Sequence, residues 1–262
     1  MTNLNPKSGN HDGSAPIFDH LEELRRRILY SLIFLVVGAG IAWTKVPQII
    51  LLLKEPLTQT KLYQADKLQL VASTLPEQLI LSFTIALWAG LAIALPFILH
   101  QVWLFIAPGL YPQERKYAGP FVIGAGISFL CGAVFCYLVI LPPMVKFLVD
   151  FLQGTVAAIF PIGTYMGQII TLLVSFGLCF EIPILAVVLT RIGIVNHVML
   201  GKIRKYAFLV CLILAAIITP TPDPINMSIA AAPLYVLYEL GVFLSRVFRV
   251  KPEERMESGN PT

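Results

Sequence analysis

Six long apolar stretches, separated by shorter polar connections, dominate the hydrophobic pattern of the chain. They lie at about residues 28–43, 77–99, 117–141, 165–190, 206–219 and 225–244. A helix needs about 20 apolar residues to cross the hydrocarbon core of a bilayer, and most of these stretches approach that length. The pattern therefore predicts an all-α integral membrane protein with six transmembrane helices.

The last two predicted helices are shorter than the others. The fifth has about 14 residues, and the sixth has about 14 mostly apolar residues before Glu239. At about 1.5 Å per residue each reaches about 21 Å, less than the about 30 Å of a hydrocarbon core. We therefore expect two short C-terminal helices in a locally thinned bilayer. Glu239 lies seven residues before Arg246, and we expect an ion pair there at the membrane interface.

The positive charges give the orientation of the predicted helices. With the N-terminus inside, fourteen of the nineteen Lys and Arg residues fall on the cytoplasmic side. Cytoplasmic loops carry the excess of these residues, so an N-in, C-in arrangement is favoured. Four of the five remaining lysines lie in the first outer connection, residues 44–75, whose leucine-rich start predicts a short surface helix. The second outer connection, residues 142–164, is apolar enough to pack against it.

The pattern divides the chain into three parts. Residues 1–16 are polar and rich in Asn, Gly and Ser, which predicts a disordered cytoplasmic tail and no cleavable signal peptide. Residues 17–248 form the transmembrane domain, including an N-terminal interfacial helix. Residues 249–262 form a second cytoplasmic tail.

Composition supports the membrane assignment and excludes other classes. The chain is 57% hydrophobic and 13% charged, whereas soluble domains carry about 25% charged residues. The net charge of +4 is too small to suggest a nucleic acid partner. The cysteines and histidines show no metal-ligand spacing, and no catalytic or phosphate-binding motif is present. We therefore expect no cofactor, no metal and no enzymatic activity.

The interfacial helix has an apolar stripe and a charged face. Ile17, Leu21, Leu24 and Ile28 follow helical spacing. The opposite face carries Glu22, Glu23 and Arg25 to Arg27, and Glu23 with Arg27 has the i,i+4 spacing of a surface ion pair. A solvated face and a positively charged anchor account for these residues, and a binding role stays open beside that interpretation.

Other polar residues have similar alternatives. With Pro112 as the first helical residue leading into the third span, Glu114 falls in the first turn, where the helix dipole favours a carboxylate. Glu114 also lies near the aromatic residues Phe105 and Tyr111 and on the same side as Glu23. Glu181 lies about 15 Å from the cytoplasmic end of the fourth span. With Gln168 it makes that span unusually polar, which indicates either a hydrogen bond between helices or a functional group.

Four segments together resemble the TatC family, the core subunit of the twin-arginine protein translocase. They are HLEELRRRI at His20 to Ile28, QVWLFIAPGLYPQER at Gln101 to Arg115, FGLCFEIP at Phe176 to Pro183, and the proline-rich turn ending at Asp223. The resemblance extends in order from about residue 18 to residue 248. The last turn reads TPTPDP where other members read TPPD, so it departs slightly from the family pattern.

The resemblance implies a glove-shaped, six-helix receptor that binds twin-arginine signal peptides of folded precursors at its cytoplasmic face. Its expected partners are TatA- and TatB-type single-span subunits, further copies of itself and the lipid bilayer, without nucleic acid. The expected location is the plasma (inner) membrane or a thylakoid membrane. The matching signal-peptide residues are Glu23 and Glu114, with Arg25, Phe105 and Tyr111 nearby. The positions expected to serve partner contact or assembly are Pro56, Glu181 and Asp223, with Gln168 beside them from its polarity alone.

The alternative from another class is an ion-coupled transporter that uses Glu181 as its titrating group. Many such transporters are built from internal repeats, and no repeat is visible in this sequence. The sequence therefore favours the receptor.

Overall fold

The computed structural model describes residues 15–65, 68–106, 118–151, 158–191, 193–221 and 223–248. The predicted N-terminal tail up to residue 14, and the predicted tail from residue 249, lie outside these ranges. The described elements in chain order are α1 (Ala15–Trp43), α2 (Val46–Thr58), α3 (Lys61–Gln64), β1 (Leu68–Val71), α4 (Glu77–Ile106), α6 (Ala118–Phe135), a π-helical segment (Cys136–Ile140), α7 (Leu141–Asp150), β2 (Ala158–Pro161), α8 (Ile162–Cys179), α9 (Glu181–Arg191), α10 (His197–Lys202), α11 (Arg204–Ile218) and α12 (Pro224–Val247).

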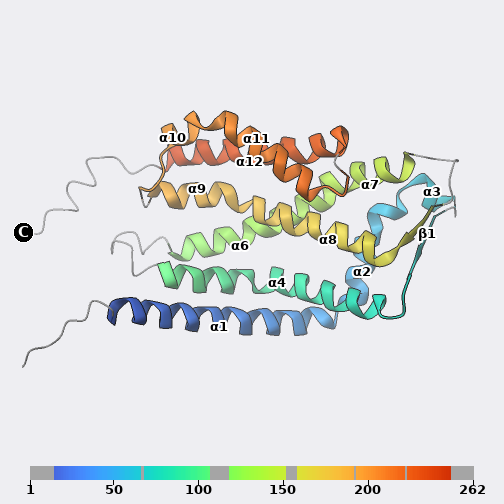
Figure 1. Ribbon diagram of the computed structural model, residues 1–262, viewed down its shortest axis with the longest axis horizontal. Coiled ribbons are helices and arrows are strands. Elements are labelled where there is room, and N and C mark those ends of the chain that lie inside the picture. Colours follow the sequence, from blue (N-terminus) through green and yellow to red (C-terminus); the bar gives the residue numbers. More distant parts are fainter. Residues whose placement is uncertain are drawn as a thin grey trace, which may run out of the picture.

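The long helices lie side by side with their axes roughly aligned (Figure 1). The start of α1, the end of α4, the start of α6 and the ends of α9 and α12 meet at one end of the bundle, which the charge distribution makes cytoplasmic. The short elements α2, α3, β1 and β2 lie at the opposite, outer end. The first and last described residues share the cytoplasmic end, as the N-in, C-in prediction requires.

Within the described ranges, five helical segments are long and apolar enough to cross a membrane. The sixth crossing is α11, which has 15 residues and returns through a turn into α12. The prediction of a short fifth helix is therefore confirmed. The prediction of a short sixth helix needs correction, because α12 is one continuous helix of 24 residues that passes through Glu239.

Glu239 has its polar partners on α11 and within α12 itself. Arg204 of α11 approaches Glu239 with its Nη2 2.8 Å from Oε2, and the Tyr235 hydroxyl donates to Oε1 at 3.1 Å. The expected pair with Arg246 is wrong, because seven residues separate the two along the helix axis by about 10 Å. A cation on the neighbouring helix therefore neutralises this carboxylate.

Prolines set the irregular points of two spans. Pro142 and Pro143 lack the N–H groups that an α-helix needs, and the chain passes through the π-helical turn just before them and continues as α7 to Asp150. The third span is therefore longer than predicted. Pro183 likewise cannot donate to the carbonyl four residues earlier, and the fourth span is divided at Phe180 into α8 and α9.

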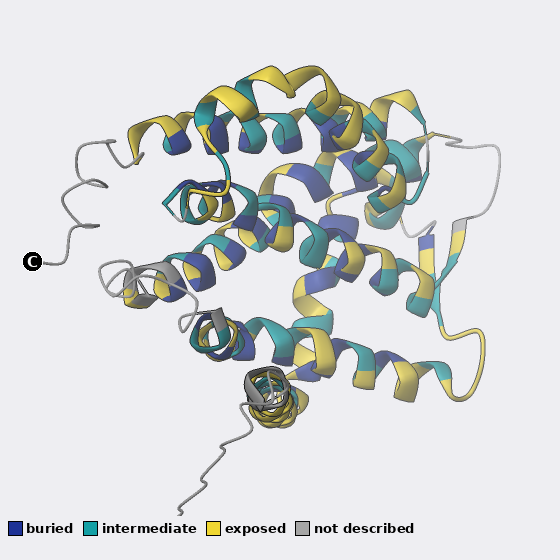
Figure 2. Ribbon diagram, turned by 60° about the vertical axis from the view of Figure 1, so that its left-hand side comes forward, coloured by how far each residue is buried: buried dark blue, intermediate teal, exposed yellow. Residues whose placement is uncertain are grey.

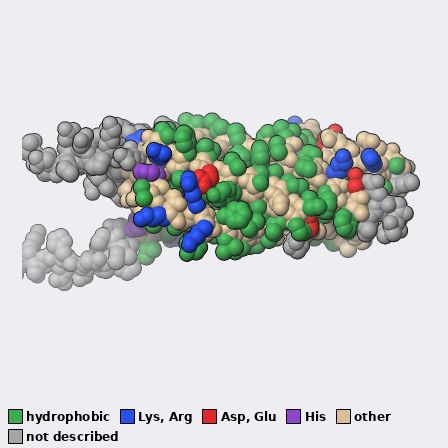
Figure 3. Space-filling model, turned by 90° about the horizontal axis from the view of Figure 1, so that it is seen from above, with side chains coloured by type: hydrophobic (Ala, Val, Ile, Leu, Met, Phe, Trp, Pro, Cys, Tyr) green, Lys and Arg blue, Asp and Glu red, His purple; other side chains and the backbone are tan. Residues whose placement is uncertain are grey.

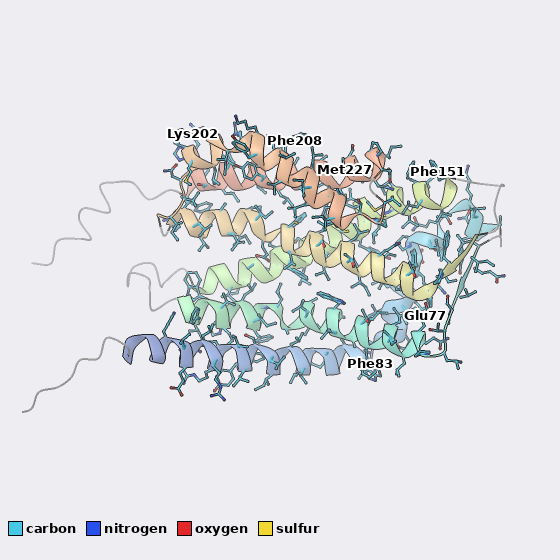
Figure 4. All side chains as sticks on the ribbon, viewed as in Figure 1. Glu77, Phe83, Phe151, Lys202, Phe208 and Met227 are labelled. Atoms are coloured by element: carbon cyan, nitrogen blue, oxygen red, sulfur yellow. The ribbon has the colours of Figure 1, made fainter. Side chains whose placement is uncertain are left out.

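The two outer connections pack against each other, as predicted. Strands β1 and β2 pair in parallel, and a cluster of Leu57, Leu68, Val145 and Val149 lies beneath them. Glu77, labelled at this end in Figure 4, accepts a hydrogen bond from the Gly163 N–H at 2.8 Å. It thereby joins the start of α4 to the segment that follows β2.

The apolar residues divide into a helix-packing core and a lipid-facing surface. The core contains fully buried residues of the third, fourth and sixth spans, among them Ile140, Met166, Phe176 and Leu234. Figure 2 shows exposed and buried residues interspersed along the long helices. Figure 3 shows hydrophobic side chains over the middle of one face, with Lys and Arg toward both ends. This distribution is the one expected where lipid surrounds the middle of the bundle and water its ends.

Candidate functional site at the cytoplasmic ends of helices α1 and α4

Helices α1 and α4 bring two of the predicted site segments together at the cytoplasmic end. The His20 ring of α1 stacks on the Phe105 ring of α4, with centroids 4.4 Å apart and planes 19° apart. The close approach continues toward the outer end, where a Cβ added to Gly90 would lie 2.3 Å from the Ala39 backbone nitrogen. Only glycine at this crossing permits the two backbones to come so near.

One turn along from His20, Glu23 takes part in a network between the two helices. Its Oε1 lies 3.1 Å from Nη2 of Arg27, and the two side chains are 26% and 18% exposed respectively. Arg27 donates from Nη1 to Oε1 of the buried Gln101 of α4 at 3.2 Å. The predicted Glu23–Arg27 pair is thus present, and its partial burial reduces the solvent screening that weakens a fully exposed pair.

The remaining signal-peptide candidates have different environments. Arg25 is exposed on α1, and an open hollow is bordered by Glu22, Glu23, Arg25, Arg26 and Leu29. Tyr111 and Glu114 lie outside the described residues. Their segment connects α4 to α6. Helix α4 ends, and α6 begins, on the cytoplasmic side where α1 starts (Figure 1).

Glu181 lies inside the bundle, at the first position of α9 after the break at Phe180. It is 8% exposed, and its Oε1 has no hydrogen-bond partner among the described residues. This oxygen therefore takes no part in a hydrogen bond between the described helices. A carboxylate in this position is costly in a bilayer unless it is neutral or meets another polar group.

Gln168 and Pro56 do not share that environment. Gln168 is exposed on α8, so its carboxamide faces outward while Glu181 faces the interior. Pro56 is buried in α2 and cannot donate to the carbonyl of Leu52. The Tyr137 hydroxyl donates to that carbonyl at 2.9 Å. The structure therefore gives Pro56 a defined place in the packing of the outer end.

Asp223 caps the N-terminus of α12. Its Oδ1 accepts hydrogen bonds from the N–H groups of Ile225 at 3.0 Å and Asn226 at 2.9 Å. Its Oδ2 accepts from the Thr221 hydroxyl at 2.6 Å. The Thr221 hydroxyl and then the Asn226 N–H are the largest of the influences that hold the pKa of Asp223 below its ordinary value of 3.8. The side chain of Asp223 therefore serves as the N-terminal cap of α12.

Sequence reasoning assigned no role to Gln101 or His20, although both stand in the motifs that it singled out. Gln101 is a polar residue in the last turns of an apolar span, where an uncompensated carboxamide would be unfavourable. That position could have indicated that Gln101 has a polar partner on another helix. The site therefore combines a half-buried carboxylate, a guanidinium, a buried carboxamide and stacked rings. Such a surface accepts hydrogen bonds from a cationic group and packs beside it.

Comparisons with known proteins agree on one family. Residues 19–233 match the family described as Sec-independent protein translocase protein (TatC). The chain is 57% identical over 248 residues to the Sec-independent protein translocase protein TatC of Deinococcus radiodurans, covering 95% of this chain and 92% of that protein. It is 34% identical over 241 residues to the protein of the same name from Aquifex aeolicus, covering 91% and 98%.

A solved structure supports the same conclusion. The crystal structure of the twin-arginine translocase receptor TatC in the detergent DDM superposes with a TM-score of 0.78 at 34% sequence identity, covering 87% of this chain and 99% of that one. A second crystal structure of the twin-arginine translocase receptor TatC gives a TM-score of 0.77 at 33% identity. The predicted fold and the predicted family are both confirmed, and this multi-pass membrane protein belongs to the TatC family of Sec-independent protein translocase components.

Proposed function

We propose that this chain is the receptor that binds twin-arginine signal peptides of folded precursors at its cytoplasmic face. The observation that carries the proposal is the half-buried Glu23 beside the His20–Phe105 stack, at the end of the bundle where the segment containing Glu114 is attached. In this proposal Glu23 and Glu114 each accept one of the two adjacent guanidiniums. Phe105 and Tyr111 exclude water, and Arg25 borders the entrance.

The chemistry of the ligand favours this assignment. A guanidinium stays charged and presents a planar fork of donors, which a carboxylate accepts in two parallel hydrogen bonds. Exposed ion pairs contribute only about 0–1 kcal/mol, so a specific site needs partial burial and further contact. The Glu23 side chain is partly buried, and the exposed apolar surface of α1 is available to the hydrophobic part of a signal peptide.

Translocation also requires further subunits. We assign the contacts with those subunits to surfaces other than the Glu23 site. Membership of the translocase family implies a complex with other translocase subunits. We propose that single-span subunits of the TatA and TatB type meet the outward-facing Gln168 of α8, and that Glu181 responds to their approach. The chain acts as a non-enzymatic receptor in the plasma membrane. The transporter alternative is not favoured, because the family matches are to protein translocase components.

Crosslinking of a synthetic twin-arginine peptide to the full-length protein in nanodiscs tests the receptor role. We expect Glu23→Gln and Glu114→Gln each to reduce crosslinking at least about tenfold, since each removes one charge-assisted contact. Glu22→Gln, which removes an exposed charge from the same helix, is the matched control and should retain most of it. Unchanged crosslinking in both Glu23→Gln and Glu114→Gln would refute the proposed site.

A further inference from the structure

Glu23 already holds a guanidinium from its own helix. Arg27 Nη2 lies 3.1 Å from Glu23 Oε1, while Arg27 Nη1 donates to Gln101 Oε1 at 3.2 Å. Gln101 is 9% exposed and belongs to α4, so it lies on the opposite wall of the contact. The carboxylate proposed to bind an incoming arginine is therefore partly occupied by a resident one.

The resident contact uses only part of the bonding capacity of both groups. The Nε of Arg27 is buried and has no acceptor among the residues that the structure describes. Within the described part of the chain, Glu23 receives its hydrogen bond on Oε1 alone, from Arg27 Nη2. A carboxylate and a guanidinium in full register form two parallel hydrogen bonds instead. A free guanidinium arriving from outside has the freedom to adopt that register.

We infer that Arg27 is a resident competitor at the Glu23 site, displaced when the arginine of a signal peptide binds; this inference rests on the proposed function. Gln101 lowers the free-energy cost of the displacement, because Arg27 keeps one hydrogen bond to the Gln101 carboxamide after leaving Glu23. Arg27 thereby holds Glu23 in a charge-compensated state between ligands. It also lowers the affinity for every cationic peptide that needs Glu23, which excludes weak ligands.

A competitor and a positioning residue have opposite effects on binding. Removing a competitor frees the carboxylate and tightens binding. The affinity should rise by a similar factor for Arg-Arg and Lys-Lys peptides, because each peptide must displace Arg27 from Glu23. Removing a residue that merely orients Glu23 weakens binding and reduces the preference for arginine. The sign of the change separates the two roles.

The test measures the dissociation constants of fluorescent Arg-Arg and Lys-Lys peptides with the full-length protein in nanodiscs. We expect Arg27→Gln to bind both peptides about two- to fivefold more tightly than the wild type. Arg26→Gln removes the same charge from the neighbouring exposed position and should change affinity less. Gln101→Leu should weaken binding, since Arg27 then lacks the carboxamide that holds it away from Glu23. This effect should disappear in the Arg27→Gln background.

Two results would overturn the inference. One is weaker binding in Arg27→Gln that Arg27→Lys restores, which would make Arg27 a positioning residue. The other is an affinity of Arg27→Gln equal to that of Arg26→Gln, which would reduce its effect to charge alone. Failure of the proposed function has a different signature, since Glu23→Gln would then leave peptide binding unchanged in the otherwise native protein. Thermal unfolding of each variant shows whether it is folded.

Discussion

The glycine contact between α1 and α4 permits a quantitative test of how the site is supported. A Cβ added to Gly90 would lie 2.3 Å from the backbone nitrogen and 2.4 Å from the Cα of Ala39. Ordinary carbon contacts are about 3.5 Å or more, so α1 has to move by about 1 Å. Backbone atoms cannot rotate away as the end of a side chain can. Gly90→Ala should therefore cost about 1–3 kcal/mol, the usual cost of overpacking.

The displacement should reach the cytoplasmic end, because α1 is a long helix of which other parts of the protein bury only a small share. The hydrogen bond from Arg27 to Gln101 is 3.2 Å long, so a further 1 Å would exceed hydrogen-bonding distance. The assays are thermal unfolding in detergent and disulfide crosslinking between cysteines placed on α1 and α4. We expect a lower midpoint and slower crosslinking.

Gly40 provides the matched control, because it lies on α1 and a Cβ there would have no atom of the described residues within 4 Å beyond the neighbouring backbone of its own helix. Gly40→Ala should be neutral or stabilise the protein by up to about 1 kcal/mol, since alanine favours a helix over glycine. If Gly90→Ala unfolds at the same temperature as Gly40→Ala, the reasoning from backbone contact is refuted.

Three further predictions concern stability. Asp223→Ala should lower the unfolding midpoint. Because the pKa of Asp223 is lowered in the folded protein, the stabilisation by this carboxylate should be complete above about pH 5 and decline below pH 3.8. Thermal scans of both proteins across pH check this, and a difference in midpoint that does not change with pH would contradict it. Tyr137→Phe leaves the Leu52 carbonyl without its donor, which should cost about 1 kcal/mol in denaturant unfolding. Thr190→Val removes the 2.6 Å hydrogen bond to the buried Ser245 hydroxyl between α9 and α12; a loss of about 1 kcal/mol is expected, and no loss would mean that the bond adds nothing.

Part of the candidate site was accessible from local sequence alone. The spacing of Glu23 and Arg27 predicts their contact, because residues four apart on a helix are neighbours in any tertiary structure. Gln101 is 74 residues from Arg27, and no local pattern indicates that the two meet. The same holds for Glu239, whose nearer candidate Arg246 proved wrong while Arg204 of α11 pairs with it.

The sequence by itself determined the membrane class, the approximate spans, the orientation and the positions of the two outer connections in the chain. These properties follow from the solvent preference of each residue, which lipid and water impose independently of the fold. Only the tertiary structure decided that Glu181 is enclosed while Gln168 faces outward, that α12 continues past Glu239, and that Arg27 bridges α1 to α4. Each of these depends on which helices are neighbours, and in the membrane that choice is made by close packing, as at Gly90, and by hydrogen bonds between distant residues.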